Sequence, residues 1–159
     1  MFRKMRRFKQ QLSDEQCVEV LKGEHRGVLS VLGDDGYPYG VPLDHWYCEE
    51  DGHLYFHGAR EGHKVDAIRS CDKASYCVFE QGVPNEKKRG LDVRCVIAFG
   101  RVRLVDDPVT TERVCRALCE ELFPGDGVYA DTEFAHSGKV VQCFELVVEH
   151  MTGKLVNES

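Results

Sequence analysis

Two turn signals near the start of the chain limit what it can fold into. Residues 34–36 (Asp-Asp-Gly) and 51–52 (Asp-Gly) each separate short segments that are rich in β-branched, leucine and aromatic residues. An Asp-Gly pair between two such segments is typical of a tight hairpin, in which neighbouring strands run antiparallel. Consecutive hairpins favour an antiparallel sheet over one built from parallel βαβ units. The strands expected around these turns are residues 27–32, 37–47 and 53–57.

The rest of the chain continues the same mixture of strands and helices. Ser13 and Gln16 have the spacing of a capping box, which predicts a helix that ends near Gly23. A helix is also expected after Asp107-Pro108, with Pro124-Gly125 as its stop. The other expected elements are a helix from Lys64 to about Ser70, strands at 73–80, 91–105 (interrupted near Gly100) and 139–149, and an exposed loop at 82–90. The pattern predicts a mainly β (α+β) fold, an antiparallel barrel of about six strands with appended helices.

Charge and hydropathy exclude some classes of partner. The net charge of −6 argues against nucleic acid as the main partner. No apolar run approaches the roughly 20 residues that span a bilayer, and no apolar segment of the secretory type follows the basic N-terminus. We therefore expect a cytoplasmic protein with no nucleic-acid or membrane partner.

The first twelve residues form a basic segment that differs from the rest of the chain. Its five cations are Arg3, Lys4, Arg6, Arg7 and Lys9. One interpretation is a solvated, partly mobile arm, and the other is an arm folded over a neighbouring subunit or near an anionic ligand. The chain is therefore divided into an arm, residues 1–12, and a single domain, residues 13–159.

The eight cysteines raise the question of a metal site or a disulfide framework. No Cys-x-x-Cys pair occurs, and the cysteines are scattered over apolar contexts, which favours reduced thiols that act as small hydrophobes. Cys115 and Cys119 lie four residues apart on a predicted helix, but no second pair completes a zinc site. His53 and His57 lie on one strand, roughly 13 Å apart, too far to share one metal ion. We expect no metal.

The clearest binding motif lies in residues 53–68. A short apolar strand runs into a turn of small residues that includes Gly58, and Lys64 then opens a helix. Backbone N–H groups at a helix start, beside a fixed cation, make a site for a phosphate. His63 could add a donor. The spacing matches neither a P-loop nor a Gly-x-Gly-x-x-Gly fingerprint.

The strand at residues 37–47 contains Pro38 and Pro42, which cannot donate to a ladder. Backbone groups beside such residues could bind the polar edge of a flat heterocycle, while Val41, Leu43 and Trp46 supply apolar surface. The alternative is that these three side chains belong to the core and that Pro42 only marks an edge strand.

In combination, these segments resemble the flavin-binding split-barrel superfamily of pyridoxamine 5′-phosphate oxidase, and within it the nitroimidazole-resistance (Nim-type) branch. The resemblance rests on four motifs in the expected order: residues 35–42 (DGYPYGVP), 52–64 (GHLYFHGAREGHK), 93–102 (VRCVIAFGRV) and 151–154 (MTGK). It implies a split form of the antiparallel β-barrel and FMN bound at a homodimer interface. The chain ends eight residues after Met151, without the Trp/Arg substrate segment of true pyridoxamine phosphate oxidases, so we do not expect that activity.

The resemblance also assigns roles to particular residues. The segment Val41, Pro42, Leu43 and Asp44 would contact the flavin ring, largely through its backbone. His57 and Gly58 would lie along the ribityl chain and phosphate, Lys64 would bind the phosphate, and His63 would assist. Cys95 stands where relatives place a polar residue near the flavin, and its thiol is a weaker donor than a hydroxyl or amide. A negative charge on Asp44 would oppose reduction of the ring unless the carboxylate is hydrogen-bonded.

The leading hypothesis is an FMN-dependent oxidoreductase that passes electrons from reduced flavin to a small organic acceptor, such as a nitro-aromatic, with NAD(P)H as a candidate donor. His57 is the one side chain we would test as a catalytic acid. The alternatives are a flavin-binding protein without turnover, which the lack of a clear catalytic acid or base favours, and a heme-binding split barrel, which the histidines and cysteines keep open.

Overall fold

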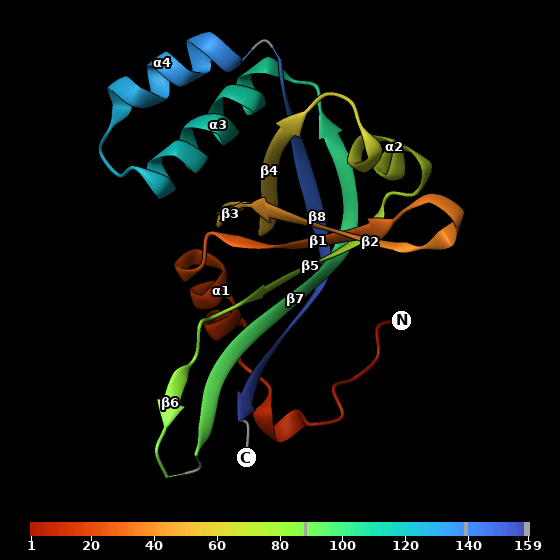
Figure 1. Cartoon of the computed structure of the whole chain (residues 1–159), viewed down its shortest axis with the longest axis vertical. Helices are drawn as coiled ribbons and strands as arrows, with labels where there is room; N and C mark the ends of the chain where they lie inside the picture. The colour runs from red at the N-terminus through yellow and green to blue at the C-terminus, as the bar shows by residue number, and fades with distance from the viewer. Residues whose placement is uncertain (88, 139, 158–159) are drawn as a thin grey trace.

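The computed structural model describes residues 1–87, 89–138 and 140–157. Runs of strands are separated by helices along the chain, and Figure 1 shows their arrangement. The elements are η1 (Phe8–Gln10), α1 (Asp14–Gly23), β1 (Arg26–Leu32), η2 (Asp34–Gly36), β2 (Pro38–Asp44), β3 (Trp46–Cys48), β4 (His53–Ala59), α2 (His63–Ser70), β5 (Lys73–Phe79), β6 (Val83–Asn85), β7 (Gly90–Val105), α3 (Pro108–Leu122), α4 (Gly127–Ser137) and β8 (Val141–Asn157).

The described strands form one antiparallel sheet of eight strands, in the order β2-β1-β5-β7-β8-β4-β3, with β6 paired to β7. The two end strands, β2 and β3, follow each other in the chain, so the sheet curls back toward its own start. This arrangement confirms the antiparallel split barrel with appended helices. Eight strands appear instead of about six because residues 37–47 divide at His45 and because Val83–Asn85 pairs with β7 inside the segment expected to be a loop.

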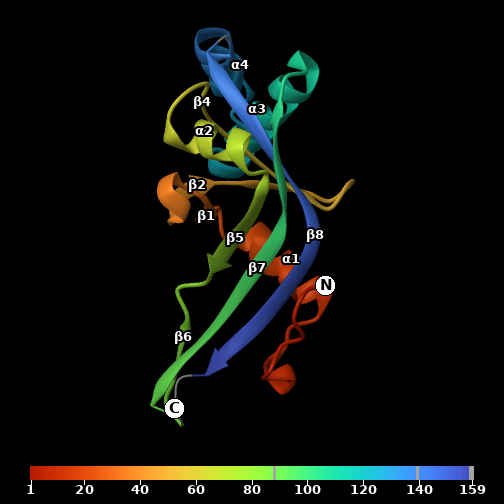
Figure 2. The ribbon, with the colours of Figure 1, turned by 90° about the vertical axis from the view of Figure 1, so that its right-hand side faces the viewer.

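The long strands β7 and β8 run the length of the molecule and hold its two halves together (Figures 1 and 2). β5 pairs with the middle of β7, whereas β4 pairs with the first part of β8. The expected interruption at Gly100 is a register shift within a continuous strand. A Cβ at Gly100 would overlap the carbonyl oxygen of Val147, so only glycine allows the two strands to approach at this irregularity.

Sequence reasoning missed one helix and misplaced one strand end. α4 was not expected, although Asp126 caps it by accepting a hydrogen bond from the Tyr129 N–H, 2.9 Å away. β8 continues to residue 157, past the predicted end at 149, because its second half pairs with the start of β7. Residue 139, where that strand was expected to begin, lies outside the described residues.

Two apolar clusters stabilise the fold, and they lie on opposite faces of β4 and β8. The main core lies inside the curled sheet and includes Phe56, Tyr76 and Phe144, each without exposed surface. The second cluster lies under α3 and consists of Cys48, Tyr55, Val114, Leu118 and Cys143. Because side chains alternate along a strand, neighbouring residues of β4 and β8 belong to different clusters.

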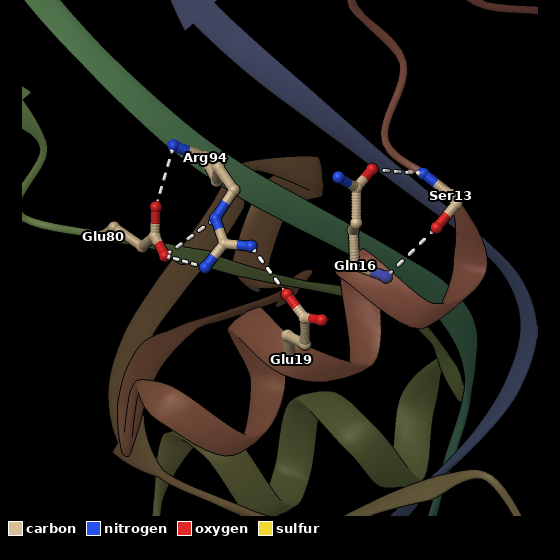
Figure 3. A network of polar contacts seen from close by, with 5 residues as sticks. All are labelled: Ser13, Gln16, Glu19, Glu80 and Arg94. Carbon is tan, nitrogen blue, oxygen red and sulfur yellow. Dashed lines mark hydrogen bonds and ion pairs between the residues drawn. The ribbon is translucent and has the colours of Figure 1, made fainter.

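α1 packs against the main core through Cys17, Val20 and Leu21. Figure 3 shows the polar contacts at its start and at Glu19. The predicted capping box is present: Ser13 Oγ accepts from the Gln16 N–H, and Gln16 Oε1 accepts from the Ser13 N–H. Arg94 donates to Glu80 on one side, at 2.6 Å and 2.9 Å, and to Glu19 of α1 on the other, at 2.9 Å. These ion pairs hold α1 against β7.

The N-terminal segment lies against the sheet along part of its length (Figure 2). The Leu12 N–H donates to the Gly153 carbonyl at 3.0 Å, and the Phe2 ring stacks on His150 with centroids 4.6 Å apart. Its role as a separate arm stays a prediction. No helix in the described part of the chain is both long and apolar enough to cross a membrane.

Candidate functional site

Lys64 lies in the first turn of α2, and its side chain reaches back over the end of β4. The ammonium nitrogen lies 4.7 Å from the centre of the Phe144 ring. A Cβ built on Gly58 would come within 2.5 Å of the same nitrogen, so the missing side chain at position 58 provides the space for the cation. Burial lowers the pKa of the Lys64 amine. Among the described residues, no carboxylate lies within ion-pair distance of this half-buried cation.

The start of α2 offers further donors beside Lys64. Gly62 occupies the N-cap position with a φ of 114°, and no side chain caps the helix. The Val65 N–H already donates to the Gly62 carbonyl at 2.8 Å, so the N–H groups of His63 and Lys64 are the ones left to another acceptor. Gly62 therefore turns the chain into the helix and leaves its start open to an anion.

His63, the other predicted donor, is held against the β1–β2 hairpin. Its ring stacks on Tyr39 with centroids 4.2 Å apart and planes 15° apart. Its Nε2 lies 3.5 Å from a carboxylate oxygen of the exposed Asp34. The imidazole thus links α2 to β2, beside Lys64 in the sequence, and brings the second predicted segment next to the first.

β2 is an end strand of the sheet, and its register explains its prolines. The His45 N–H bonds to the His25 carbonyl and the Gly33 N–H to the Tyr37 carbonyl, so the odd-numbered residues of β2 face β1. The backbone groups of even-numbered residues therefore point to the outer edge, where Pro42 lacks only an outward N–H. The open groups at this edge include the Gly40 N–H and the Pro42 carbonyl, as the edge interpretation requires.

The side chains of the predicted ring-binding segment are less available than its backbone. Leu43 packs against the main core, and Trp46 packs against the cluster under α3. Val41 is half-buried, whereas Pro42 is exposed. The structure therefore confirms that Pro42 marks an edge strand and that Leu43 and Trp46 pack against the core clusters. Binding of a flat heterocycle by the backbone of this edge stays a prediction.

Asp44 does not carry an uncompensated negative charge. Its two carboxylate oxygens accept from the Arg26 guanidinium at 2.5 Å and 3.0 Å. The hydrogen bond from Arg26 is the main reason that the pKa of Asp44 is lowered. Arg26, which sequence reasoning did not single out, thus neutralises the one acid in the predicted ring-binding segment. The signal available in the sequence was its position at the start of the strand that pairs with β2.

His57 lies on the other face of β4, the one turned toward α3. Its ladder partner is Cys143, which lies in the cluster under α3, whereas Gly58 faces Lys64 and Phe144. The imidazole lines a cavity of about 170 Å³ between α3, α4 and the sheet. Desolvation by the surrounding protein is the main cause that lowers the pKa of His57. The negative charge of Asp44 opposes this shift, and the nearby Lys64 cation adds to it. His57 is therefore a neutral imidazole at pH 7.

Cys95 lies in the other half of the sheet. It pairs with Phe79 and with Lys154 and is near enough to Cys17 of α1 to influence its pKa. Phe144, which lies under Lys64, pairs with Leu104 of β7. Leu104 follows Cys95 by nine residues, which corresponds to roughly 30 Å of strand. Within one chain, the structure brings together the sites at β2, β4 and α2 and leaves Cys95 apart from them.

The comparisons with known proteins agree with this architecture. A family model described as pyridoxamine 5′-phosphate oxidase matches residues 13–155. No curated protein matches the chain.

Several solved structures share the fold at low sequence identity. A candidate 5-nitroimidazole antibiotic resistance protein of Bacteroides thetaiotaomicron is 17% identical with a TM-score of 0.77, over 91% of this chain and 86% of that one. The flavocytochrome of Azotobacter vinelandii is 18% identical with a TM-score of 0.79, over 98% and 73% of the two chains. An FAD-binding protein of Mesorhizobium loti is 24% identical with a TM-score of 0.68, over 93% and 98%.

Proposed function

The chain belongs to the pyridoxamine 5′-phosphate oxidase family, and we propose that it is a flavin-dependent oxidoreductase that holds FMN between α2, β4 and the edge of β2. The observation that carries the proposal is Lys64, a half-buried cation with no carboxylate partner in the described chain. Partial burial of an unpaired charge is unfavourable. A bound phosphate would relieve it, because charge-assisted hydrogen bonds to phosphate are among the strong ones.

The phosphate end of FMN fits the donors around Lys64. The ammonium, the uncapped start of α2 and the His63 ring present positive charge and N–H groups in one region. Gly58 keeps the approach to the ammonium free of a side chain. This donor set fits a phosphate monoester and gives FMN an advantage over a flavin without a phosphate.

The ring end of FMN fits the outer edge of β2. Within the segment Val41 to Asp44, the backbone groups of Pro42 and Asp44 would contact the ring at that edge, because Val41 and Leu43 bond to β1 and the Leu43 side chain packs against the core. Asp44 leaves no net charge there, since Arg26 holds both of its oxygens. The protein thus orients the ring by hydrogen bonds and does not oppose its reduction with an unpaired anion.

When bound, FMN would supply the redox chemistry, accepting hydride from a donor such as NAD(P)H and reducing a small organic acceptor such as a nitro-aromatic. The protein's part is to bind, orient and protonate. A neutral His57, close enough to Asp44 and Lys64 for both charges to influence its pKa, could hold a proton at one ring nitrogen for the acceptor. The structural relatives include a flavocytochrome and an FAD-binding protein, which supports a flavin cofactor.

We also propose that FMN sits at a homodimer interface. Within one chain Cys95 lies far along β7 from the residues around Lys64. Its predicted contact with the flavin therefore requires the second subunit. We propose in addition that the protein is cytoplasmic, as expected from the sequence.

The visible absorption spectrum of the purified protein tests the proposal. We expect a flavin spectrum as purified or after addition of FMN, and release of FMN, not FAD, on denaturation. A colourless protein that takes up no flavin would overturn it. A Soret band on adding hemin, lost in a single His→Ala variant, would favour the heme alternative instead.

Anaerobic mixing with NADPH or NADH separates an enzyme from a flavin-binding protein without turnover. Rapid loss of the flavin colour, followed by its return on adding a nitro-aromatic, is the result expected for an oxidoreductase. Persistent colour with both nucleotides would support the non-catalytic alternative.

A further inference from the structure

Two thiols meet at the wall of the cavity beside His57, and the proposed flavin chemistry uses neither. Cys115 of α3 and Cys143 of β8 have their sulfurs 3.8 Å apart. Cys143 has no exposed surface, whereas Cys115 is half-buried. A disulfide has a sulfur–sulfur bond of about 2.05 Å, so the pair lies in contact but unbonded. The two sulfurs would have to approach each other by about 2 Å to form the bond.

Cys115 can be reached from the cavity, and Cys143 lies behind it. The cavity between α3, α4 and the sheet has a volume of about 170 Å³ and is lined mainly by carbon, including the rings of Phe123, Tyr129 and Phe134. Its acidic side chain, Glu133, disfavours anions. An apolar cavity of about 150 Å³ accommodates a molecule the size of benzene. The space therefore suits a small, uncharged, largely apolar molecule in contact with the Cys115 sulfur.

The neighbouring thiol also activates Cys115. The hydrogen-bonding contact with Cys143 lowers the pKa of the Cys115 thiol, and burial opposes it. The same contact and burial raise the pKa of Cys143. The accessible thiol is thus the better nucleophile, and the buried one stays protonated until it is used.

We propose that Cys115 and Cys143 form a dithiol that reduces apolar organic hydroperoxides entering this cavity. The Cys115 thiolate attacks the terminal oxygen of the hydroperoxide, the O–O bond breaks, and the alkoxide leaves and takes up a proton as the alcohol. The sulfenic acid on Cys115 is then attacked by Cys143, which forms the disulfide and releases water. Two thiols and one hydroperoxide give one disulfide, one alcohol and one water.

The disulfide would connect α3 to β8 at the ladder partner of His57. Oxidation would therefore fix the wall of the cavity beside the residue proposed to serve the flavin site. The thiol chemistry itself does not depend on flavin, so it stands or fails separately from the proposed function.

Treatment of the reduced, full-length protein with substoichiometric cumene hydroperoxide in the dark tests the proposal. Trypsin cleavage after Arg116 separates Cys115, in residues 114–116, from Cys119, in residues 117–139, and Cys143 falls in residues 140–154. We expect loss of the mass of two hydrogen atoms from the intact protein and a cross-link between residues 114–116 and 140–154 that a reductant reverses. A cross-link to Cys119, or oxidation scattered over all eight cysteines, would overturn the assignment.

Single variants separate the two roles. Cys143→Ser should retain a sulfenic acid at Cys115 that dimedone traps, and Cys115→Ser should abolish both sulfenic acid and cross-link. Cys119→Ser, which removes a thiol of the same cavity, should leave the cross-link intact. Cumene hydroperoxide should react faster than hydrogen peroxide, and equal rates would contradict the role of the apolar cavity. Dimedone trapping at Cys143 instead of Cys115 would contradict the order of attack.

Discussion

The two faces of β4 differ in chemistry although their residues are neighbours in the sequence. On the face toward the main core, Gly58 makes room for the Lys64 ammonium above Phe144. On the face toward α3 and α4, His57 and Cys143 lie beside an apolar cavity. One face carries a fixed positive charge, and the other carries a neutral imidazole and thiols. The difference follows from the period of two in a strand, which sends adjacent residues to opposite sides.

This comparison separates binding from reactivity. The Lys64 face can hold an anionic group, because its cation has no partner in the described chain. The α3 face holds no fixed charge at His57 and is suited to an uncharged molecule. Substitutions on the two faces should therefore have separable effects, which the following predictions order from the largest to the smallest.

The largest effect is expected from Phe144→Ala. Removing this buried ring should lower the free energy of unfolding by about 3–5 kcal/mol and should also weaken FMN binding, because Lys64 loses its apolar support. Leu118→Ala, in the cluster under α3, should cost about 2–5 kcal/mol and leave FMN affinity unchanged. Chemical denaturation and FMN titration measure the two effects. Equal losses of FMN affinity in both variants would break the distinction between the faces.

His45 should make stability depend on pH on the main-core side. Its Nε2 donates to the Leu21 carbonyl at 2.8 Å and its Nδ1 lies 2.9 Å from the Tyr76 hydroxyl, which also lies 2.7 Å from the Leu43 carbonyl. Burial lowers the pKa of His45 to about 4, against about 6.5 in an unfolded chain. The folded state therefore disfavours protonation of His45. The contribution of the neutral imidazole to the free energy of unfolding is fully present above about pH 6.5.

As the pH falls from 6.5 to 4, the His45 contribution should be lost, up to about 3 kcal/mol. Denaturation at pH 7.5 and pH 4, at one protein concentration, should show this loss in the wild type and a smaller one in His45→Gln. The same pH dependence in both proteins would show that carboxylates alone account for it.

Gly58→Ala should reduce FMN affinity about tenfold, or about 1.4 kcal/mol, without unfolding the protein. The new methyl group would displace the flexible end of Lys64, so the cation moves while the strand stays. Gly23→Ala, with no atom within 4 Å of the added Cβ, is the matched control. FMN titration by fluorescence quenching measures both. An unchanged affinity in Gly58→Ala would place the anion site elsewhere.

The smallest effect on flavin binding is expected from His57→Ala. Because the imidazole faces the cavity under α3 and α4, the variant should bind FMN within about twofold of the wild type. Reoxidation of the reduced protein by a nitro-aromatic should become slower and lose its dependence on pH near the His57 pKa. Stopped-flow measurements over a pH range check this. A large loss of FMN affinity would return His57 to the phosphate side.

Much of this arrangement could be predicted from the sequence, because its signals are local. The hairpin turns, the capping box at Ser13 and the start of α2 at Lys64 each depend on residues within a few positions of one another. The expectation that Pro42 lies on an edge strand was confirmed for the same reason.

The remaining features depend on contacts between distant segments. The division of residues 37–47 at His45 reflects its bonds to Leu21 and Tyr76, and the ion pair that neutralises Asp44 depends on the β1–β2 register. The contact between Cys115 and Cys143 joins residues 28 positions apart through the packing of α3 on the sheet. α4 was missed despite its Asp126 cap, since its pattern of apolar residues is weak. The predicted roles of the flavin-site residues stay predictions.

The most direct test of the Lys64 site compares FMN with riboflavin, which lacks the phosphate, in the wild type and in Lys64→Ala. The wild type should prefer FMN by about 1–3 kcal/mol, the range of a charge-assisted hydrogen bond. This preference should largely vanish in Lys64→Ala and persist in Lys87→Ala, which removes an exposed lysine from the β6–β7 connection. Equal preference for FMN in all three proteins would contradict the account, because the phosphate would then lie away from Lys64.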